Sequence, residues 1–452
     1  MKFVHTLTGA LVLAALLIAV APMAGQLKSP PPDYHSLGRA FVMNLAASQF
    51  DKAAAMLSPQ VAAALPAEKL GQVWDSLIAQ EGAFQQIESA TVAEQASFHI
   101  VTVTCAFAHA RLNVIPALDD AGRIVGLHFA PVYEWTAPSY ANPSSFHEIS
   151  VTVADGQWQL PGTLTLPNGK GPFPAVVLVA GSGPEDEDET IGPNKPFKDI
   201  AWGLASRGIA VLRYTKRTKQ YGVKSSTDAS TFTVKDEYIE DARAAVSQLA
   251  ARSEIDPKRI FLAGHSEGGY VAPRIASGDA QLAGIAILEG STRPLEKLIL
   301  DQLHYEASLG GPNATEIEKM IPDAEKAAAQ IESPDLKPGE TVSIIGASLP
   351  ASYILDLRDY DPAAVAAGLK IPILVIQGSR DYQVTTTDYA GWQKALSGHA
   401  NVTFKLFPDI NHLMISGSGP SSPQEYMQPG QHVSAEVINA IFSWITSAAL
   451  QH

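Results

Sequence analysis

The residues best suited to covalent chemistry lie in one short segment, residues 264–269, which reads Gly-His-Ser-Glu-Gly-Gly. A predicted strand, residues 259–263, comes directly before it, and a helical pattern follows. A serine on a sharp turn from a strand into a helix presents its hydroxyl as a nucleophile, and such a turn needs small flanking residues. Gly264 and Gly268 occupy the positions two before and two after the serine. The segment predicts Ser266 as a nucleophile; the alternative is a glycine-rich turn with an incidental serine.

A serine hydroxyl needs a base to activate it, and the base needs an acceptor that fixes its tautomer. In the chain order serine, acid, histidine, the acid follows a later strand and the histidine follows the last one. Asp381 stands on the loop that leaves the apolar run 373–376, and we predict it to be the acid. Glu289 ends the preceding strand and is the reserve candidate, and a solvated turn aspartate is the alternative role for Asp381.

Four of the 12 histidines follow Asp381 in the chain, and one of them, His399, comes before the final predicted strand, 403–407. His412 comes immediately after the final predicted strand, where a loop can bring an imidazole back over the serine, and we predict it to be the base. His432 lies in a Pro-, Gly- and Gln-rich loop and His452 is the terminal residue, so neither competes well. We interpret His265, beside the nucleophile, as structural, and the alternative for His412 is a structural or exposed histidine.

The amides that bind an oxyanion in such a site come from the residue after the nucleophile and from the loop after the first parallel strand. That loop, residues 179–184, reads Val-Ala-Gly-Ser-Gly-Pro. We predict the Ser182 N–H and the Glu267 N–H as the two donors, with Gly183 as the alternative to Ser182. Each donor would stabilise the transition state by about 3 kcal/mol.

A dense acidic run, residues 185–189, lies beside this loop. Its carboxylates could bind Ca²⁺, but we favour a solvated face or local ion pairs. We therefore predict no metal site. The cations considered as partners are Lys195, Lys198, Arg213, Lys216 and Arg217.

Short apolar runs that alternate with helical patterns indicate a buried parallel sheet in residues 140–452. Residues 148–153 and 158–166 are predicted to form a hairpin in front of it. We therefore expect an α/β domain with helices on both faces of its sheet and a helical cap inserted at about 295–367. The six runs are 176–179, 209–213, 260–263, 285–288, 373–376 and 403–407, and the main helical segments are 197–206, 236–252, 270–275 and 434–449.

The N-terminal third has a different organisation. Lys2 and the apolar stretch 11–24 are typical of a secretory signal, so we expect residues 1–25 to be a signal peptide or, if uncleaved, a membrane anchor, and the protein to be secreted or periplasmic. Consecutive prolines make residues 26–34 an extended linker. Helical patterns followed by alternating strands predict a small α+β domain over residues 35–135.

The charge balance excludes one class of partner. Lys and Arg total 32 against 46 Asp and Glu, which gives a formal net charge of −14. A field of this sign repels phosphate backbones. We expect no nucleic-acid partner, and membrane contact only through an uncleaved N-terminal segment.

Several of these segments together resemble secreted bacterial α/β-hydrolases related to dienelactone hydrolases and the serine aminopeptidase-like group, some of which carry an N-terminal domain of the DUF3887 type. The resemblance spans most of residues 145–450 and implies an α/β-hydrolase fold and carboxylesterase activity on fairly small acyl esters, without a cofactor. Thr215 stands where relatives often have Asp, and Ala180 where the broader fold has His; neither change touches Ser266, Asp381 or His412. The segments that carry it are 180–184, 190–197, 211–214, 264–269, 377–381 and 411–412, with weaker N-terminal matches at 40–42 and 74–84.

The favoured function is hydrolysis of a small-molecule carboxylic ester through an acyl-enzyme. The first alternative is a peptidase or amidase, because the same three residues can cleave amides. The second alternative is a non-catalytic binding protein on a hydrolase scaffold, which predicts degraded site residues. Ser266, Asp381 and His412 are all present.

Overall fold

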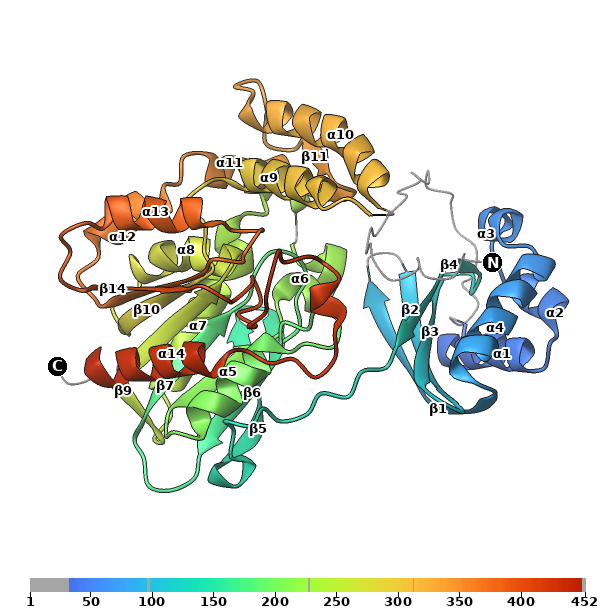
Figure 1. The fold of residues 1–452 in the computed structure, drawn as a ribbon, viewed down its shortest axis with the longest axis horizontal. Helices are drawn as coiled ribbons and strands as arrows, with labels where there is room; N and C mark the ends of the chain where they lie inside the picture. The colour runs from blue at the N-terminus through green and yellow to red at the C-terminus, as the bar shows by residue number, and fades with distance from the viewer. Residues whose placement is uncertain (1–31, 96–97, 227, 312, 449–452) are drawn as a thin grey trace. The chain divides into compact units, whose positions relative to one another are not determined.

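The computed structural model describes residues 32–95, 98–226, 228–311 and 313–448 (Figure 1). The described chain divides into two compact units, the first comprising residues 32–134 together with Tyr221–Lys224 and the second comprising the rest of 135–448. The predicted signal, residues 1–25, and most of the predicted linker, 26–34, lie outside the described residues. Among the helices that the structure describes, none is long and apolar enough to cross a membrane.

The first unit places four helices on one face of a four-stranded antiparallel sheet in the order β1-β2-β3-β4 (Figure 1). Strand β3 alternates between half-buried and buried residues, as expected for a strand with one face on a core. Phe41, Trp74 and Val103 are among the fully or almost fully buried side chains between the layers. The predicted small α+β domain is therefore confirmed as a fold class. Its elements are α1 Tyr34–Ala46, α2 Phe50–Ala54, α3 Pro59–Ala64, α4 Ala67–Glu81, β1 Phe84–Gln95, β2 Phe98–Phe107, β3 Arg111–Leu118 and β4 Ile124–Pro131.

The second unit contains an eight-stranded sheet in the order β5-β6-β8-β7-β9-β10-β13-β14. Only β6 runs antiparallel to the rest, and only β7 and β8 are exchanged relative to chain order. This strand order, with a turn bearing a serine after the fifth strand, is the α/β-hydrolase arrangement and confirms the predicted fold class. The strands are β5 Phe146–Asp155, β6 Trp158–Pro167, β7 Phe173–Val179, β8 Ala210–Tyr214, β9 Ile255–His265, β10 Leu282–Leu288, β13 Ile373–Gly378 and β14 Val402–Phe407.

Helices cover both faces of this sheet. Helices α5 and α14 contact one another and share one core with the sheet, whereas α7 and α8 pack on strands at the other face (Figure 1). The helices are α5 Pro196–Ala205, α6 Arg217–Tyr221, α7 Glu240–Ala250, α8 Glu267–Ala276, α13 Thr386–Ala395 and α14 Ala435–Ala448; short turns are η1 Pro143–Ser145, η2 Gly222–Lys224, η3 Ala229–Thr231, η4 Lys235–Ile239 and η5 Glu425–Met427.

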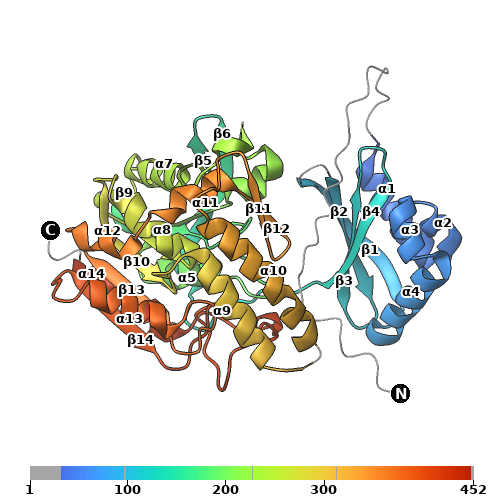
Figure 2. The ribbon, with the colours of Figure 1, turned by 90° about the horizontal axis from the view of Figure 1, so that it is seen from above.

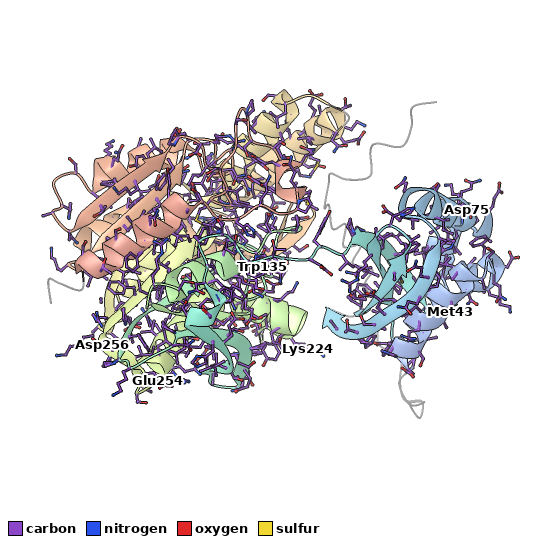
Figure 3. All side chains as sticks on the ribbon, turned by 60° about the horizontal axis from the view of Figure 1, so that its bottom comes forward. Met43, Asp75, Trp135, Lys224, Glu254 and Asp256 are labelled. Carbon is purple, nitrogen blue, oxygen red and sulfur yellow. The ribbon has the colours of Figure 1, made fainter. Side chains whose placement is uncertain are left out.

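The start of the second unit is fixed by Trp135 (Figure 3). Its indole N–H donates to Asp199 at 2.9 Å, and its ring meets Trp202 edge to face at a centroid distance of 4.8 Å. Lys198 lies over the same ring, 4.6 Å from its centre. These contacts anchor the entering chain to helix α5.

Two sequence-based expectations for this unit are wrong in detail. The run 403–407 was expected to be buried, but β14 is the edge strand with one neighbour, β13, and Leu406 is 46% exposed. The helix expected at 236–252 begins instead with the π-helical turn η4, whose wider turn buries Tyr238. Such turns often mark functional sites.

The segment between β10 and β13 forms a cap with its own small core (Figure 2). Its helical content agrees with the prediction, but the two-stranded hairpin β11–β12 was not predicted. Helix α12 packs on α8 and α13, so it belongs to the helical layer of the sheet. The elements are α9 Leu295–Ser308, α10 Ala314–Glu332, β11 Thr341–Ile344, β12 Ala347–Pro350, α11 Ala351–Arg358 and α12 Pro362–Gly368.

Candidate active site

Ser266 stands alone between the end of β9 and the start of α8. Its backbone has φ +53° and ψ −117°, a strained combination for a residue with a side chain. A Cβ at Gly264 would lie 2.1 Å from the Gly268 carbonyl oxygen, and one at Gly268 would lie 2.2 Å from the Val179 carbonyl oxygen. Only glycine fits these two positions, which explains their spacing around the serine.

Replacing Gly268 by alanine is therefore expected to lower the free energy of unfolding by about 3 kcal/mol, because the clash is with backbone and no side chain can move away. Urea unfolding of the full chain measures it. Gly368→Ala is the matched control, since this exposed glycine ends α12 and a Cβ there meets open space; it should change stability by less than about 0.5 kcal/mol. Equal stability of the two variants would contradict the packing argument.

Asp381 and His412 are joined by a hydrogen bond, although 31 residues separate them in the chain. His412 Nδ1 lies 2.7 Å from Asp381 Oδ2, and both residues are 4% exposed. The other oxygen of Asp381 accepts the backbone N–H groups of Gln383 and Val384, at 2.8 and 3.0 Å. A carboxylate acceptor at Nδ1 places the proton there and leaves the Nε2 lone pair free to take a proton.

The loop that carries His412 is tied to the serine turn through His265. Its Nε2 donates to the His412 carbonyl oxygen at 2.8 Å, and its Nδ1 lies 2.9 Å from Glu189 Oε1. Burial lowers the pKa of His265, but the Glu189 carboxylate outweighs it, and the pKa is raised overall. Because both ring nitrogens are occupied, His265 holds the site together and does not act as a base.

The glycine-rich loop after β7 lies against the serine. A Cβ added to Gly181 would be 3.1 Å from Ser266 Cβ and 3.6 Å from Ser266 Oγ. The Gly181 N–H donates to Glu189 Oε1 at 2.6 Å. Ser182 and Gly183 line the cavity in front of Ser266, together with Glu267. Both predicted donor residues, Ser182 and Glu267, therefore border the space in which an oxyanion would form.

Glu289, the reserve acid, is placed beside Asp381 and not against the imidazole. Its Oε2 accepts from Gln377 Nε2 at 2.6 Å and from the Gly378 N–H at 3.0 Å. Burial raises the pKa of Glu289 well above its ordinary value, and the Asp381 carboxylate adds to that increase. Burial thus favours the neutral form of Glu289, and the carboxylate that contacts His412 is that of Asp381.

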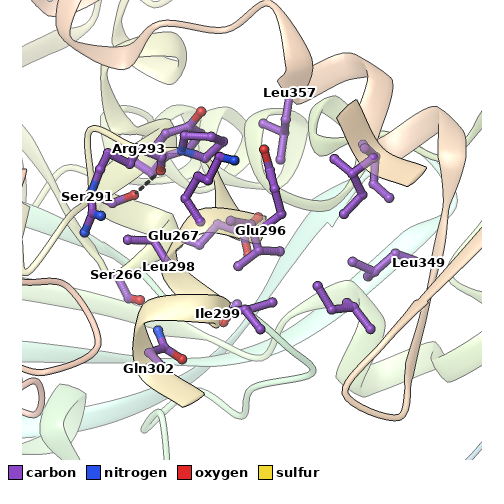
Figure 4. Close-up of a pocket in the computed structure, with 18 of the residues that line it drawn as sticks. Ser266, Glu267, Ser291, Arg293, Glu296, Leu298, Ile299, Gln302, Leu349 and Leu357 are labelled. Carbon is purple, nitrogen blue, oxygen red and sulfur yellow. Dashed lines mark hydrogen bonds between the residues drawn. The ribbon is translucent and has the colours of Figure 1, made fainter. Parts of the chain in front are cut away.

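A cavity of about 670 Å³ opens from Ser266 under the cap. Aliphatic side chains make up nearly half of its lining, and Figure 4 shows Leu298 and Ile299 of α9 close to Ser266. Arg293, at its edge, is already paired with Asp388 and Asp301. Such a cavity suits an apolar group with a few polar anchors. Its other aliphatic residues include Leu295, Ile331, Ile344, Leu349, Ile354 and Leu357.

The acidic run 185–189 is only partly as expected. Asp188 pairs with Lys195 and Arg213, both at 2.9 Å, which confirms local ion pairs. Glu189, however, is 2% exposed and turns inward, so a solvated face is wrong there; its partners, the Gly181 amide and His265, become neighbours only in the fold. Within the described residues, no group of three or more His, Cys, Asp or Glu side chains is arranged to hold a metal ion.

Comparison with known proteins shows the family to which the chain belongs. Residues 39–127 match the family described as Protein of unknown function (DUF3887). Esterase EstD of Thermotoga maritima is 44% identical over 407 residues, which span 90% of this chain and 93% of EstD. The chain belongs to the EstD family of esterases. Membership of the EstD family confirms the resemblance to esterases that carry an N-terminal DUF3887 domain.

Solved structures similar to this EstD-family chain are more distant. Est1E from Butyrivibrio proteoclasticus is 14% identical, with a TM-score of 0.44, over 67% of this chain and 99% of Est1E. An esterase from Pyrococcus furiosus is 17% identical, with a TM-score of 0.43, over 70% of this chain and 96% of that one.

Three residues that contact Gly181 beside Ser266 were not predicted as site residues: Glu189, Lys216 and Tyr238. The sequence indicates a solvated face or local ion pairs for Glu189 and Lys216, and a helix at 236–252 for Tyr238. No local motif marks them, since each makes its contacts with Gly181 through the fold.

Proposed function

We propose that this EstD-family protein hydrolyses carboxylic esters of small molecules through an acyl-enzyme on Ser266, with His412 as the base and Asp381 as its orienting acid. The observation that carries the proposal is the 2.7 Å contact between His412 Nδ1 and Asp381 Oδ2 in a sheet whose serine turn is strained and glycine-lined. Membership of an esterase family supports ester hydrolysis.

In the proposed acylation step, His412 Nε2 takes the proton of Ser266 Oγ while Oγ bonds to the ester carbonyl carbon. The carbonyl oxygen becomes an oxyanion that accepts hydrogen bonds from the amides of Glu267 and Ser182. The C–O bond to the alcohol then breaks, and His412 gives its proton to the departing oxygen. Water, deprotonated by the same imidazole, releases the acid and restores Ser266.

The aliphatic part of the cavity lining supports a preference for substrates with apolar acyl groups of modest size. Its volume of about 670 Å³ is of the order that encloses a small-molecule ligand. Secretion or periplasmic location stays a prediction that rests on residues 1–25.

Substrate panels test the proposal. We expect p-nitrophenyl acetate and butyrate to be hydrolysed with a higher kcat/KM than p-nitrophenyl palmitate, and each short ester to exceed aminoacyl p-nitroanilides. The comparison uses initial rates of p-nitrophenol or p-nitroaniline release by the full chain. Turnover dominated by the anilides would make the protein an amidase or peptidase, and the proposed substrate class would be wrong.

A further inference from the structure

The Gly181 carbonyl oxygen, next to the serine, accepts two hydrogen bonds from buried side chains. Lys216 Nζ donates to it at 2.9 Å and the Tyr238 hydroxyl lies 2.7 Å away. Lys216 also donates to the Tyr238 oxygen at 2.7 Å and lies 3.2 Å from a Glu237 carboxylate oxygen. An ammonium has three N–H donors, so Gly181, Tyr238 and Glu237 account for all of them.

The direction of this carbonyl fixes the direction of the next amide. The Gly181 C=O and the Ser182 N–H belong to one planar, trans peptide unit and point to opposite sides of it. Lys216 and Tyr238, at 3% and 1% exposure, hold the oxygen toward the protein interior. The Ser182 N–H is therefore turned to the other side, where Ser182 lines the cavity.

The Gly181 amide of this loop is already occupied. The Gly181 N–H donates to Glu189 at 2.6 Å. Across the residues that the structure describes, no acceptor engages the Ser182 N–H. The Gly183 N–H has no acceptor among the described residues either, so what distinguishes Ser182 is the peptide orientation fixed by the Gly181 carbonyl.

Tyr238 also contacts the side chain of Glu267, the residue whose N–H is the second expected oxyanion donor. Its hydroxyl lies 3.1 Å from Glu267 Oε2, and Glu267 Oε1 accepts from the Tyr353 hydroxyl of the cap helix α11 at 2.9 Å. Burial raises the pKa of Tyr238 well above its ordinary value, and the nearby Glu267 carboxylate contributes, so the hydroxyl keeps its proton. One tyrosine thus contacts both segments whose amides face the cavity at Ser266.

We propose that Lys216 and Tyr238 are positioning residues that aim the Ser182 N–H at the substrate oxyanion by holding the Gly181 carbonyl. The inference rests on the proposed function. A positive charge at the carbonyl end polarises the peptide and strengthens its N–H as a donor. The π-helical turn η4 supplies the geometry, because it turns Tyr238 inward beneath the loop.

The test uses Tyr238→Phe and Lys216→Met in the full chain, with p-nitrophenyl butyrate as substrate. We expect kcat to fall by about 10- to 100-fold, less than the loss on removing an oxyanion donor outright, while KM changes little. Binding of a trifluoromethyl ketone, which forms an oxyanion on the serine, should weaken in proportion to kcat. Titration with a fluorophosphonate corrects each rate for the fraction of active protein.

Tyr140→Phe is the matched control, because the Tyr140 hydroxyl also donates to a backbone carbonyl, that of Val433, at 2.8 Å. It should keep the wild-type kcat. Wild-type kcat and inhibitor affinity in folded Tyr238→Phe would overturn the inference, and this variant decides alone if Lys216→Met does not fold. If Ser266→Ala is inactive while both variants match wild type, only the inference falls; if Ser266→Ala is fully active, the proposed function falls with it.

Discussion

Replacing Ser266 by alanine is expected to lower kcat for p-nitrophenyl butyrate by about 10⁵- to 10⁶-fold. The variant keeps the cavity and both predicted oxyanion amides but has no oxygen that can form the acyl-enzyme. Alanine fits the turn as serine does, since both carry a Cβ at φ +53°, so the fold should be unchanged. Initial-rate kinetics and circular dichroism of the same preparation measure the two effects.

The matched control is Ser277→Ala, at the far end of the same helix α8, where the hydroxyl donates to the Arg274 carbonyl oxygen. It removes the same atom from a partly exposed turn and should leave kcat within about threefold of wild type, as expected for a surface substitution. A Ser266→Ala variant as active as Ser277→Ala would show that the nucleophile lies elsewhere.

Replacing Asp381 by asparagine is expected to lower kcat by about 10⁴-fold at neutral pH. In the native protein, Asp381 Oδ2 lies 2.7 Å from His412 Nδ1. The asparagine amide has the same size as the native side chain but offers no carboxylate to this nitrogen. The imidazole then favours the tautomer with its proton on Nε2, which cannot accept the serine proton. The measurement is the dependence of kcat on pH for both proteins.

Glu289→Gln separates this effect from the mere loss of a buried carboxyl group. Burial raises the pKa of Glu289 and so favours its neutral form, which glutamine resembles. Glutamine also keeps an oxygen for Gln377 and Gly378. We expect kcat to fall less than about tenfold.

The raised pKa of Glu289 means that the folded state binds the proton more tightly than the unfolded state, so native stability falls as pH rises above about 4.3. Glu289→Gln should lose this dependence. A loss of kcat equal to that of Asp381→Asn would make Glu289 the acid.

The serine turn and the central strands could be predicted because their signals are local. Residues 373–376 of β13 are an unbroken apolar run, and all six residues of the strand are buried. Gly264 and Gly268 are required by contacts that every turn of this type makes. Strand β14 differs, because Thr403 and Lys405 interrupt its apolar residues and none of its six residues is fully buried. This mixed composition was the available signal for its place at the edge of the sheet beside β13.

The parts that escaped prediction have specific physical causes. The cap hairpin β11–β12 closes through Ile345 and Gly346, both at positive φ, and isoleucine is a poor signal for such a turn. Glu189 and His265 are 76 residues apart and meet only after folding. The inward direction of Tyr238 follows from the π-helical turn η4, whose residues read as an ordinary helix.

The most direct test of the central claim is covalent labelling. The full chain is treated with a fluorophosphonate probe, and the modified residue is located by intact mass and peptide mapping. We predict one adduct per chain, on Ser266, with loss of ester hydrolysis in the same proportion and no adduct on Ser266→Ala. An adduct on another residue, or equal labelling of Ser266→Ala, would contradict Ser266 as the nucleophile.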